Sequence, residues 1–184
     1  MYKIILAIFV TVLISSRILF AQVTSLNVTI NQPGNQGETA IASNPGDPTK
    51  MMIGYNYYQF PNDLTKSCTP GFAFSSDGGV NWATGDRPPS GFTYGFDPSV
   101  GYDKRNHAIL CLVAKHQASG LGRTYVSFTS DQGGLWKDEP VSTSTDRCDK
   151  PAMAIDNGVY DGRVYIAWRE ASQGLEQIKF RISL

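Results

Sequence analysis

A short motif that occurs twice limits what this 184-residue chain can fold into. Both copies read Ser/Thr-x-Asp-x-Gly-x-x-Trp; the first begins at Ser75 and the second at Thr129. The two copies are 54 residues apart. A further 54 residues lead to Ser183, where the short segment that precedes and begins the motif occurs again. A fixed period of this size is typical of repeat architectures, in which each repeat is one small structural unit. We therefore expect a repeat protein, and we expect this chain to be the front part of a longer one.

Each repeat contains the same series of strand signals, separated by turn residues such as Asn44-Pro45-Gly46. The apolar segments are 40–44, 50–57 and 71–74, then 99–103, 107–115 and 124–128, then 152–156, 163–168 and 177–182. A weaker fourth strand follows each complete motif, near 83–84 and at 139–142. No stretch has a sustained helical periodicity, so we expect almost no helix. Four short antiparallel strands per repeat of about 50 residues form the blade of a β-propeller, whose neighbours cover both of its faces.

The motif itself has a structural interpretation. An Asp at the head of a tight turn accepts backbone N–H groups, Gly supplies positive φ angles, and Trp offers a large apolar surface to bury between sheets. The motif lacks the further carboxylates at alternating positions that a calcium loop requires. The residues assigned this structural role are Ser75, Asp77, Gly79, Trp82, Thr129, Asp131, Gly133 and Trp136.

The N-terminus reads as a secretory signal peptide over residues 1–21. Lys3 precedes an apolar run from Ile4 to Ile14, and cleavage after Ala21 removes Lys3 and Arg17, which leaves 14 basic against 16 acidic residues. A retained membrane anchor is the alternative, although Arg17 interrupts the run before the ~18 apolar residues that a span requires. The near-neutral balance argues against nucleic-acid binding and gives no polybasic membrane patch. We therefore expect a secreted, periplasmic or cell-surface protein without a membrane span after cleavage.

The three cysteines and two histidines give little sign of redox or metal chemistry. Cys111 lies inside an apolar run and is expected to be a buried thiol. Cys68 and Cys148 fall in expected loops, where they pair with each other, pair with a cysteine elsewhere, or stay free. His107 and His116 lack the spacing of metal ligands. We expect no cofactor and no metal.

The two motifs resemble the Asp-box, or bacterial neuraminidase (BNR) repeat, of sialidase-like β-propellers. The segments 97–100, 149–156 and 162–168 also resemble secreted sialidase-like propellers, whereas Asn81 and Leu135 replace the family's Thr. The resemblance implies an all-β sialidase-like β-propeller with about three four-stranded blades present of a probable six. The blades are expected at about 38–90 and 97–145, with an incomplete third at 149–184, inside a partial propeller over 22–184. Missing C-terminal blades or a second copy would be needed to close it.

The same resemblance implies an exported glycoside hydrolase that acts on terminal sugars of glycans, inactive as this chain alone. The alternative is a non-catalytic secreted propeller that binds glycan or protein, because fold does not fix function. In the family, an Arg of the substrate-binding triad lies in a Phe/Tyr-Arg-Ile-Pro segment ahead of the first box. No such segment occurs here, so the resemblance assigns no catalytic residue.

Strand geometry instead places a site on the face opposite the boxes. Three carboxylates stand there just before the expected innermost strands, and one of them would be a general acid if burial raised its pKa. Asp97 is the first choice, because Phe92, Tyr94 and Phe96 offer an apolar flank; the alternative is that all three cap their linkers. Arg147 and Arg169 would bind a substrate carboxylate, or else are solvated loop arginines. Tyr57 and Tyr58 would stack on a sugar ring, or else pack within the strand or loop. The catalytic candidates are Glu38, Asp97 and Asp149, and the substrate-binding candidates are Arg147, Arg169, Tyr57 and Tyr58.

Overall fold

The computed structural model describes residues 35–58, 68–89, 91–116, 119, 121–143, 147–159, 162–172 and 174–183. The expected signal peptide over 1–21 lies outside these residues. Eleven strands and no helix occur in the described part of the chain, so no helix there is long and apolar enough to cross a membrane. No group of three or more His, Cys, Asp or Glu side chains that could hold a metal ion occurs within the same ranges.

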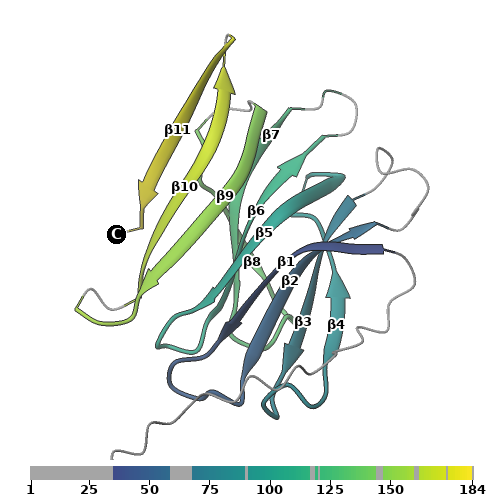
Figure 1. The fold of residues 1–184 in the computed structure, drawn as a ribbon, viewed down its shortest axis with the longest axis vertical. Coiled ribbons are helices and arrows are strands. Elements are labelled where there is room, and N and C mark those ends of the chain that lie inside the picture. The colour runs from purple at the N-terminus through teal and green to yellow at the C-terminus, as the bar shows by residue number, and fades with distance from the viewer. Residues whose placement is uncertain are drawn as a thin grey trace, which may run out of the picture.

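The strands form three antiparallel sheets in which neighbours in sequence are neighbours in space. The first sheet contains β1 (Asn35–Ser43), β2 (Met51–Tyr58), β3 (Cys68–Ser75) and β4 (Ala83–Asp86). The second contains β5 (Tyr94–Tyr102), β6 (Ala108–Lys115), β7 (Gly122–Thr129) and β8 (Lys137–Pro140). The third contains β9 (Arg147–Asp156), β10 (Arg163–Ser172) and β11 (Leu175–Ile182). Figure 1 shows the three sheets side by side, with the second in the middle.

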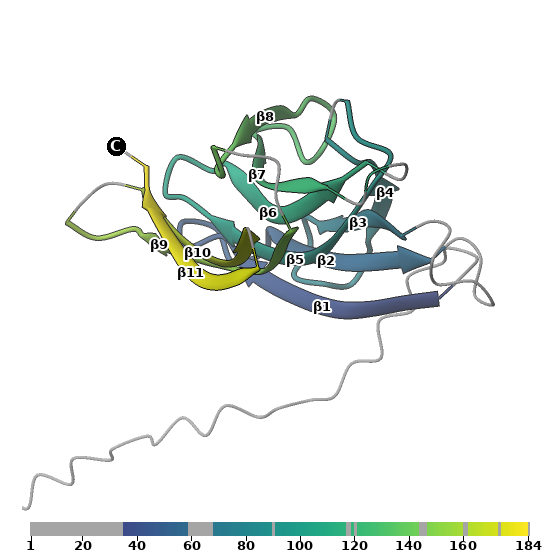
Figure 2. The ribbon, with the colours of Figure 1, turned by 90° about the horizontal axis from the view of Figure 1, so that it is seen from above.

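The order of strands within each sheet defines an inner and an outer side. The first strands lie against one another, since β1 contacts β5 and β5 contacts β9. The last strands, β4 and β8, both lie on the far side of the molecule from β1 (Figure 2). The sheets therefore radiate from a common inner side, as the blades of a propeller do.

The hydrophobic core lies between the sheets. β6 is central to it, because its residues are buried from Ala108 to Ala114. Its even-numbered side chains pack against the first sheet and its odd-numbered ones against the third, as the period of two in a strand requires. Burying each Leu or Val side chain there contributes roughly 1.5–3 kcal/mol. We call the face that a sheet turns toward the next sheet along the chain its forward face, and the opposite one its backward face.

Both Asp-boxes form the same turn between the third and fourth strands. In the first, Asp77 Oδ1 accepts the backbone N–H of Val80 at 3.0 Å and that of Asn81 at 2.9 Å. Ser75 Oγ accepts the N–H of Gly79 at 2.9 Å, and Gly79 has a φ of 92°. These charge-assisted bonds hold the pKa of Asp77 at about 2, the largest cause being the N–H of Asn81.

The second box repeats this arrangement. The Thr129 hydroxyl donates to Asp131 Oδ1 at 2.6 Å, and Asp131 Oδ1 also accepts the N–H of Leu135 at 2.9 Å. Gly133 has a φ of 94°, close to that of its counterpart in the first box. The two turns therefore share one conformation, in which the carboxylate satisfies backbone donors that the tight turn leaves unpaired.

The first strands begin earlier than the sequence pattern predicts. β1, β5 and β9 start at Asn35, Tyr94 and Arg147, about five residues before the expected apolar entries. Each pairing of a first strand with its neighbour contains a register shift, between Gly37 and Ala40, between Phe96 and Ser99, and opposite Ala167 to Arg169. A bulge interrupts the alternation of side chains, so only the half of each strand that follows the bulge is recognisable as a strand in the sequence.

All three cysteines are free and buried, so Cys68 and Cys148 do not pair with each other. Burial raises the pKa of Cys68 and of Cys111 to about 12, which keeps both as unreactive thiols. We expect a thiol reagent to label no cysteine in the folded protein and all three after unfolding without reductant. A disulfide between Cys68 and Cys148 would instead leave one reactive thiol in the unfolded chain, which is the result that contradicts this prediction.

Candidate functional site

The inner strand of every sheet carries one residue with a positive φ angle at its bulge. These residues are Glu38 in β1 (φ 48°), Asp97 in β5 (φ 55°) and Lys150 in β9 (φ 46°). A non-glycine residue in this region is strained by on the order of 1–3 kcal/mol, and such strain clusters at functional sites. The equivalent position in the third sheet is thus occupied by Lys150, whereas the sequence analysis assigned it to Asp149. The next residue is proline in both Asp97-Pro98 and Lys150-Pro151, which aligns the two bulges.

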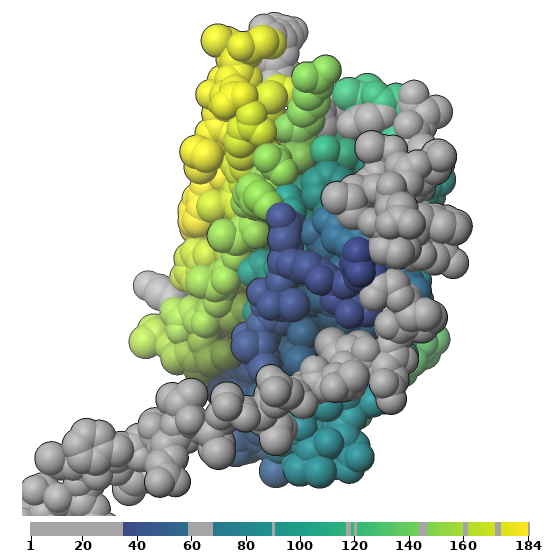
Figure 3. Space-filling model, turned by 45° about the vertical axis from the view of Figure 1, so that its right-hand side comes forward, coloured from purple at the N-terminus to yellow at the C-terminus, as the bar shows by residue number. Residues whose placement is uncertain are grey.

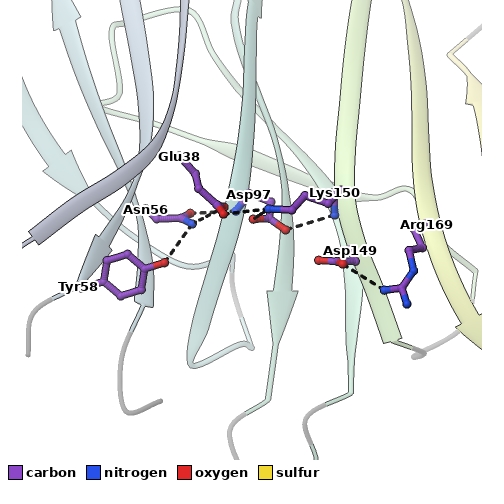
Figure 4. Close-up of polar contacts among 7 residues, drawn as sticks. All are labelled: Glu38, Asn56, Tyr58, Asp97, Asp149, Lys150 and Arg169. Carbon is purple, nitrogen blue, oxygen red and sulfur yellow. Dashed lines mark hydrogen bonds and ion pairs between the residues drawn. The ribbon is translucent and has the colours of Figure 1, made fainter. Parts of the chain in front are cut away.

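The three residues meet in one ion cluster that joins all three sheets (Figure 4). Lys150 Nζ lies 2.9 Å from Glu38 Oε1 and 3.0 Å from Asp97 Oδ1. The backbone N–H of Lys150 also donates to Asp97 Oδ2 at 3.2 Å. Sequence analysis did not identify Lys150 as a site residue, although alignment of the two prolines would have found it.

Asn56 of β2 supports the cluster through its side-chain amide. The amide nitrogen donates to Glu38 Oε2 at 2.8 Å, and the carbonyl oxygen accepts the backbone N–H of Asp97 at 2.9 Å. Asn56 is only 1% exposed, so these bonds satisfy a polar group that would be costly to bury alone. This amide therefore fixes β5 and the Glu38 carboxylate relative to each other. It was also missed, because an Asn between Tyr residues in an apolar strand gives no functional signal.

An open hollow of about 470 Å³ surrounds the cluster, and we call it the axial hollow. It lies at the end of the strands away from the boxes, since Cys68 at the start of β3 lines it and the first box follows the end of β3. Its lining residues are Glu38, Asn56, Tyr58, Cys68, Tyr94, Phe96, Asp97, Asp149 and Lys150. The three carboxylates predicted from the sequence are thus brought together here, with Tyr58, Tyr94 and Phe96 as an aromatic wall.

The carboxyls of the cluster differ in their acidity. Asp97 is buried, and burial, the largest cause, together with the nearby Glu38 carboxyl raises its pKa to about 6 against the opposing effect of Lys150. The contacts of Glu38 with the Asp97 carboxyl and the Lys150 ammonium lower the pKa of Glu38. Both carboxyls raise the pKa of Lys150, which stays a cation. Near neutral pH the hollow therefore holds a readily protonated acid next to an ionised carboxylate.

A second hollow of about 320 Å³ adjoins the first, and Asp149 lines both. We call it the cationic hollow, because it contains Lys115, Arg147 and Arg169. Arg169 donates from Nη1 to Asp149 Oδ2 at 3.1 Å and also pairs with Glu176. Arg147 is exposed, and its guanidinium has no hydrogen-bond or ion-pair partner among the described residues. Lys115 Nζ lies 4.3 Å from the centre of the Phe96 ring, and burial lowers the pKa of this lysine.

Two aromatic residues from the sequence analysis lie away from both hollows. Tyr57 is 7% exposed and packs with Tyr55 and Ala73 on the backward face of the first sheet. Phe92 stacks on His116 at 4.4 Å between ring centres, so it does not flank Asp97 as Tyr94 and Phe96 do. Alternation along β2 explains the first case, because consecutive side chains point to opposite faces and only Tyr58 reaches the axial hollow.

Comparisons with known proteins bear on the fold. No family model matches the chain, and no curated protein matches it. Among solved structures, a protein of unknown function from Dyadobacter fermentans DSM 18053 aligns with a TM-score of 0.62 and 15% identity, over 83% of this chain and 49% of its own. A member of the GH130 family of mannoside phosphorylases, a family described as containing glycoside hydrolases that target beta-1,2 mannosidic linkages in Candida mannan, aligns at 0.51 and 11% identity, over 82% and 49%.

The chain has part of a β-propeller fold. This follows from its radiating antiparallel sheets, two of four strands and one of three, together with the GH130 structure, which is a propeller. A third structure, fructan 1-exohydrolase IIa from Cichorium intybus, aligns at a TM-score of 0.38 with 13% identity, over 81% of this chain and 42% of its own. The chain spans about half the length of the two higher-scoring structures. At these identities the likeness concerns the fold alone.

Proposed function

We propose that this chain carries part of the active site of an exported, sialidase-like glycoside hydrolase that acts on terminal sugars. The observation that supports the proposal most directly is the pair formed by Asp97 and Glu38 in the axial hollow. Burial and the neighbouring carboxyl raise the pKa of Asp97 to about 6, while Glu38 is shifted in the opposite direction. Two carboxyls whose pKa values are pushed apart are the usual arrangement for an acid and a charged partner in glycoside cleavage.

Each group then has a defined task. Asp97 in its protonated form donates a proton to the glycosidic oxygen as the bond to the leaving group breaks, and a water molecule then adds to the sugar and returns a proton to Asp97. Glu38 stays ionised and stabilises the positive charge that develops on the sugar ring. Tyr58 forms part of the wall of the axial hollow. Burial raises the pKa of its hydroxyl, so Tyr58 stays neutral and serves as a contact surface for the sugar.

The cationic hollow supports an acidic sugar as the substrate. Arg147 offers an exposed guanidinium, and Lys115 lies beside it with its charge partly shielded from water by Phe96. A planar guanidinium pairs well with a carboxylate. Because Asp149 lines both hollows, a sugar carboxylate bound at Arg147 and a glycosidic oxygen near Asp97 fit one ligand that spans both. The hydrolases described for the GH130 structure support the wider class of glycan-cleaving proteins.

A titration with a sialic acid methyl glycoside, followed by NMR, tests the substrate class. We expect the acid to bind weakly and its neutral methyl ester at least 10-fold more weakly, since the ester lacks the charge that Arg147 recognises. Arg147→Gln should weaken binding of the acid by a similar factor. Lys137→Gln, which removes an exposed cation on the outer strand β8, should leave it unchanged. Equal binding of acid and ester would contradict the proposed substrate.

Hydrolysis is expected only when further sheets complete the ring around the axial hollow, and not from these 184 residues alone. In such a complete protein, Asp97→Asn should lower kcat by about 10²–10⁴. A fluorogenic sialoside measures both results. Turnover by this chain alone would contradict the first expectation, and an unchanged kcat in the D97N variant would contradict the role of the acid.

One observation favours a non-catalytic propeller that binds glycan. Lys150 Nζ contacts both carboxyls within 3.0 Å, and this arrangement resembles a structural link between sheets more than a site with a free acid. In that case the glycan would bind at the two hollows, with Asp97 ionised throughout. The pH dependence of stability separates these alternatives, because only the catalytic one requires a proton on Asp97 near pH 6.

A further inference from the structure

A further hollow, of about 180 Å³, lies between the first and second sheets at the end of the strands that carries the boxes. We call it the box hollow, because residues of the second box line it. This end is the lower end of the molecule in Figures 1 and 3, where turns of the first sheet, in blue and teal, reach the surface. The lining of the box hollow combines buried residues with more exposed polar ones. The buried ones are Phe74, Tyr102 and Ala108, and the polar ones include Lys50, Asn106 and Asp131.

Tyr102, at the end of β5, has an unsatisfied hydroxyl. Its side chain is 5% exposed, and its hydroxyl oxygen is buried with no hydrogen-bond partner among the described residues. Burial raises the pKa of Tyr102 to about 12, so the hydroxyl keeps its proton and is able to donate as well as accept. A buried hydroxyl without a partner is unfavourable. A polar group bound in the box hollow, which Tyr102 lines, would remove this cost.

The third sheet shows that packing alone does not require a tyrosine at this position. Ile155 stands directly before Asp156, as Tyr102 stands before Asp103. Ile155 packs against the core between the second and third sheets, and Tyr102 belongs to the core between the first and second. An apolar side chain therefore fills the equivalent place without the cost of a buried hydroxyl. The hydroxyl of Tyr102 calls for an explanation other than the core.

Lys50 and Asn106 add hydrogen-bond donors to the lining. Asn106 Oδ1 accepts Lys50 Nζ at 3.1 Å and Asn44 Nδ2 at 2.6 Å. These two bonds use both lone pairs of the amide oxygen, so the amide nitrogen of Asn106 is left to donate. The ammonium of Lys50 has three donors, of which Asn106 takes one and Asp47, at 3.7 Å, takes part in a long ion pair. The lining therefore holds donors that the protein does not fully use.

The composition of the lining favours an uncharged ligand with several hydroxyl groups. Its charges are one ammonium, from Lys50, and one carboxylate, from Asp131, so a net charge on the ligand gains little. Sugar hydroxyls both donate and accept, while the C–H groups of a sugar ring pack on apolar surface such as that of Ala108. The volume of 180 Å³ equals that of about six water molecules, at roughly 30 Å³ each, which admits one sugar ring and not a chain of them.

We propose that the box hollow binds one uncharged sugar ring, whose hydroxyl groups form hydrogen bonds with Tyr102, Lys50 and Asn106. The site lies at the opposite end of the strands from the axial hollow and shares no lining residue with it or with the cationic hollow. It involves binding without a chemical step. The proposal therefore does not depend on the function suggested above.

Saturation-transfer NMR with the methyl glycosides of glucose, galactose, mannose and N-acetylglucosamine tests the proposal. We expect at least one of them to bind with a Kd on the order of 1 mM, as suits a ligand of about a dozen non-hydrogen atoms. Tyr102→Phe should weaken this binding about 10-fold, since it removes only the hydroxyl. The same variant should keep or raise the melting temperature, because an unpaired buried hydroxyl is lost. Tyr125→Phe is the matched control, since Tyr125 packs on the same core cluster without lining the hollow, and it should leave binding unchanged.

Lys50→Met provides a second variant, which should also weaken binding of the neutral glycoside because it removes a charged donor. If none of the four glycosides binds, the Tyr102 hydroxyl is satisfied by water alone and the proposal is overturned. Binding that is unchanged in the Y102F variant would place the sugar elsewhere and overturn it as well. So would a methyl glucuronide that binds at least 10-fold more tightly than the methyl glucoside in a manner that depends on Tyr102, because the hollow would then be an anion site. The sialoside titration with Arg147→Gln reports on the proposed hydrolase separately.

Discussion

Replacing Trp136 by alanine is expected to lower the free energy of unfolding by about 3 kcal/mol. The Trp136 ring lies against Phe72 and Phe74, and the Arg87 guanidinium sits 5.7 Å from its centre. Its removal leaves a cavity between the first and second sheets and breaks two aromatic contacts. The expected loss is at the low end for tryptophan because Trp136 is only half-buried, and its Nε1 has no hydrogen-bond partner among the described residues.

Urea unfolding of the wild type and the W136A variant measures this loss. Leu135→Ala is the matched control, because Leu135 is 79% exposed and should change stability by no more than about 0.5 kcal/mol. A double-mutant cycle with Phe74→Ala should give a coupling energy of about 0.5–1.5 kcal/mol between the two rings. Equal effects at 135 and 136, or no coupling with Phe74, would show that the box tryptophan does not join neighbouring sheets.

The repeat was enough to predict the fold from the sequence. The constant period and the three recurring strand signals correctly indicated radiating antiparallel sheets, and the uninterrupted apolar run of β6 indicated a strand covered on both faces. The starts of β1, β5 and β9 were missed. At each bulge the residue with positive φ, such as Asp97, shifts the register, so the first half of the strand loses the alternation that a pattern search detects.

The candidate site was only partly predictable. Glu38, Asp97 and Asp149 converge because equivalent positions of neighbouring sheets lie around one inner side. The partners that set their charge were not apparent, since they depend on contacts between sheets. Lys150 reaches Glu38 across 112 positions of sequence, and no local pattern encodes that contact. The separate surroundings of Tyr57 and Tyr58 also depended on the register of β2, which the sequence pattern left undefined.

The second large effect concerns Asp97. We expect the free energy of unfolding of the Asp97→Asn variant to rise relative to that of the wild type by about 2 kcal/mol as the pH rises from 4.5 to 7. The pKa of Asp97 is raised from 3.8 to about 6 in the folded protein. A group with a raised pKa contributes stability that is present below its unfolded value and is lost as the pH rises through the folded value. Asparagine has no such loss, and it tolerates the positive φ of this position.

Urea unfolding at pH 4.5, 5.5, 6.5 and 7 measures the difference in the free energy of unfolding between the D97N variant and the wild type. Asp77→Asn is the control of opposite sign, because the pKa of Asp77 is lowered to about 2 and its stabilisation is lost only as the pH falls below about 4. The difference in the free energy of unfolding between the D77N variant and the wild type should therefore stay nearly constant from pH 4.5 to 7. If the difference between D97N and the wild type is constant too, Asp97 remains ionised beside Lys150 at all these pH values. The cluster would then be a structural link between sheets, and the axial hollow would bind a glycan without cleaving it.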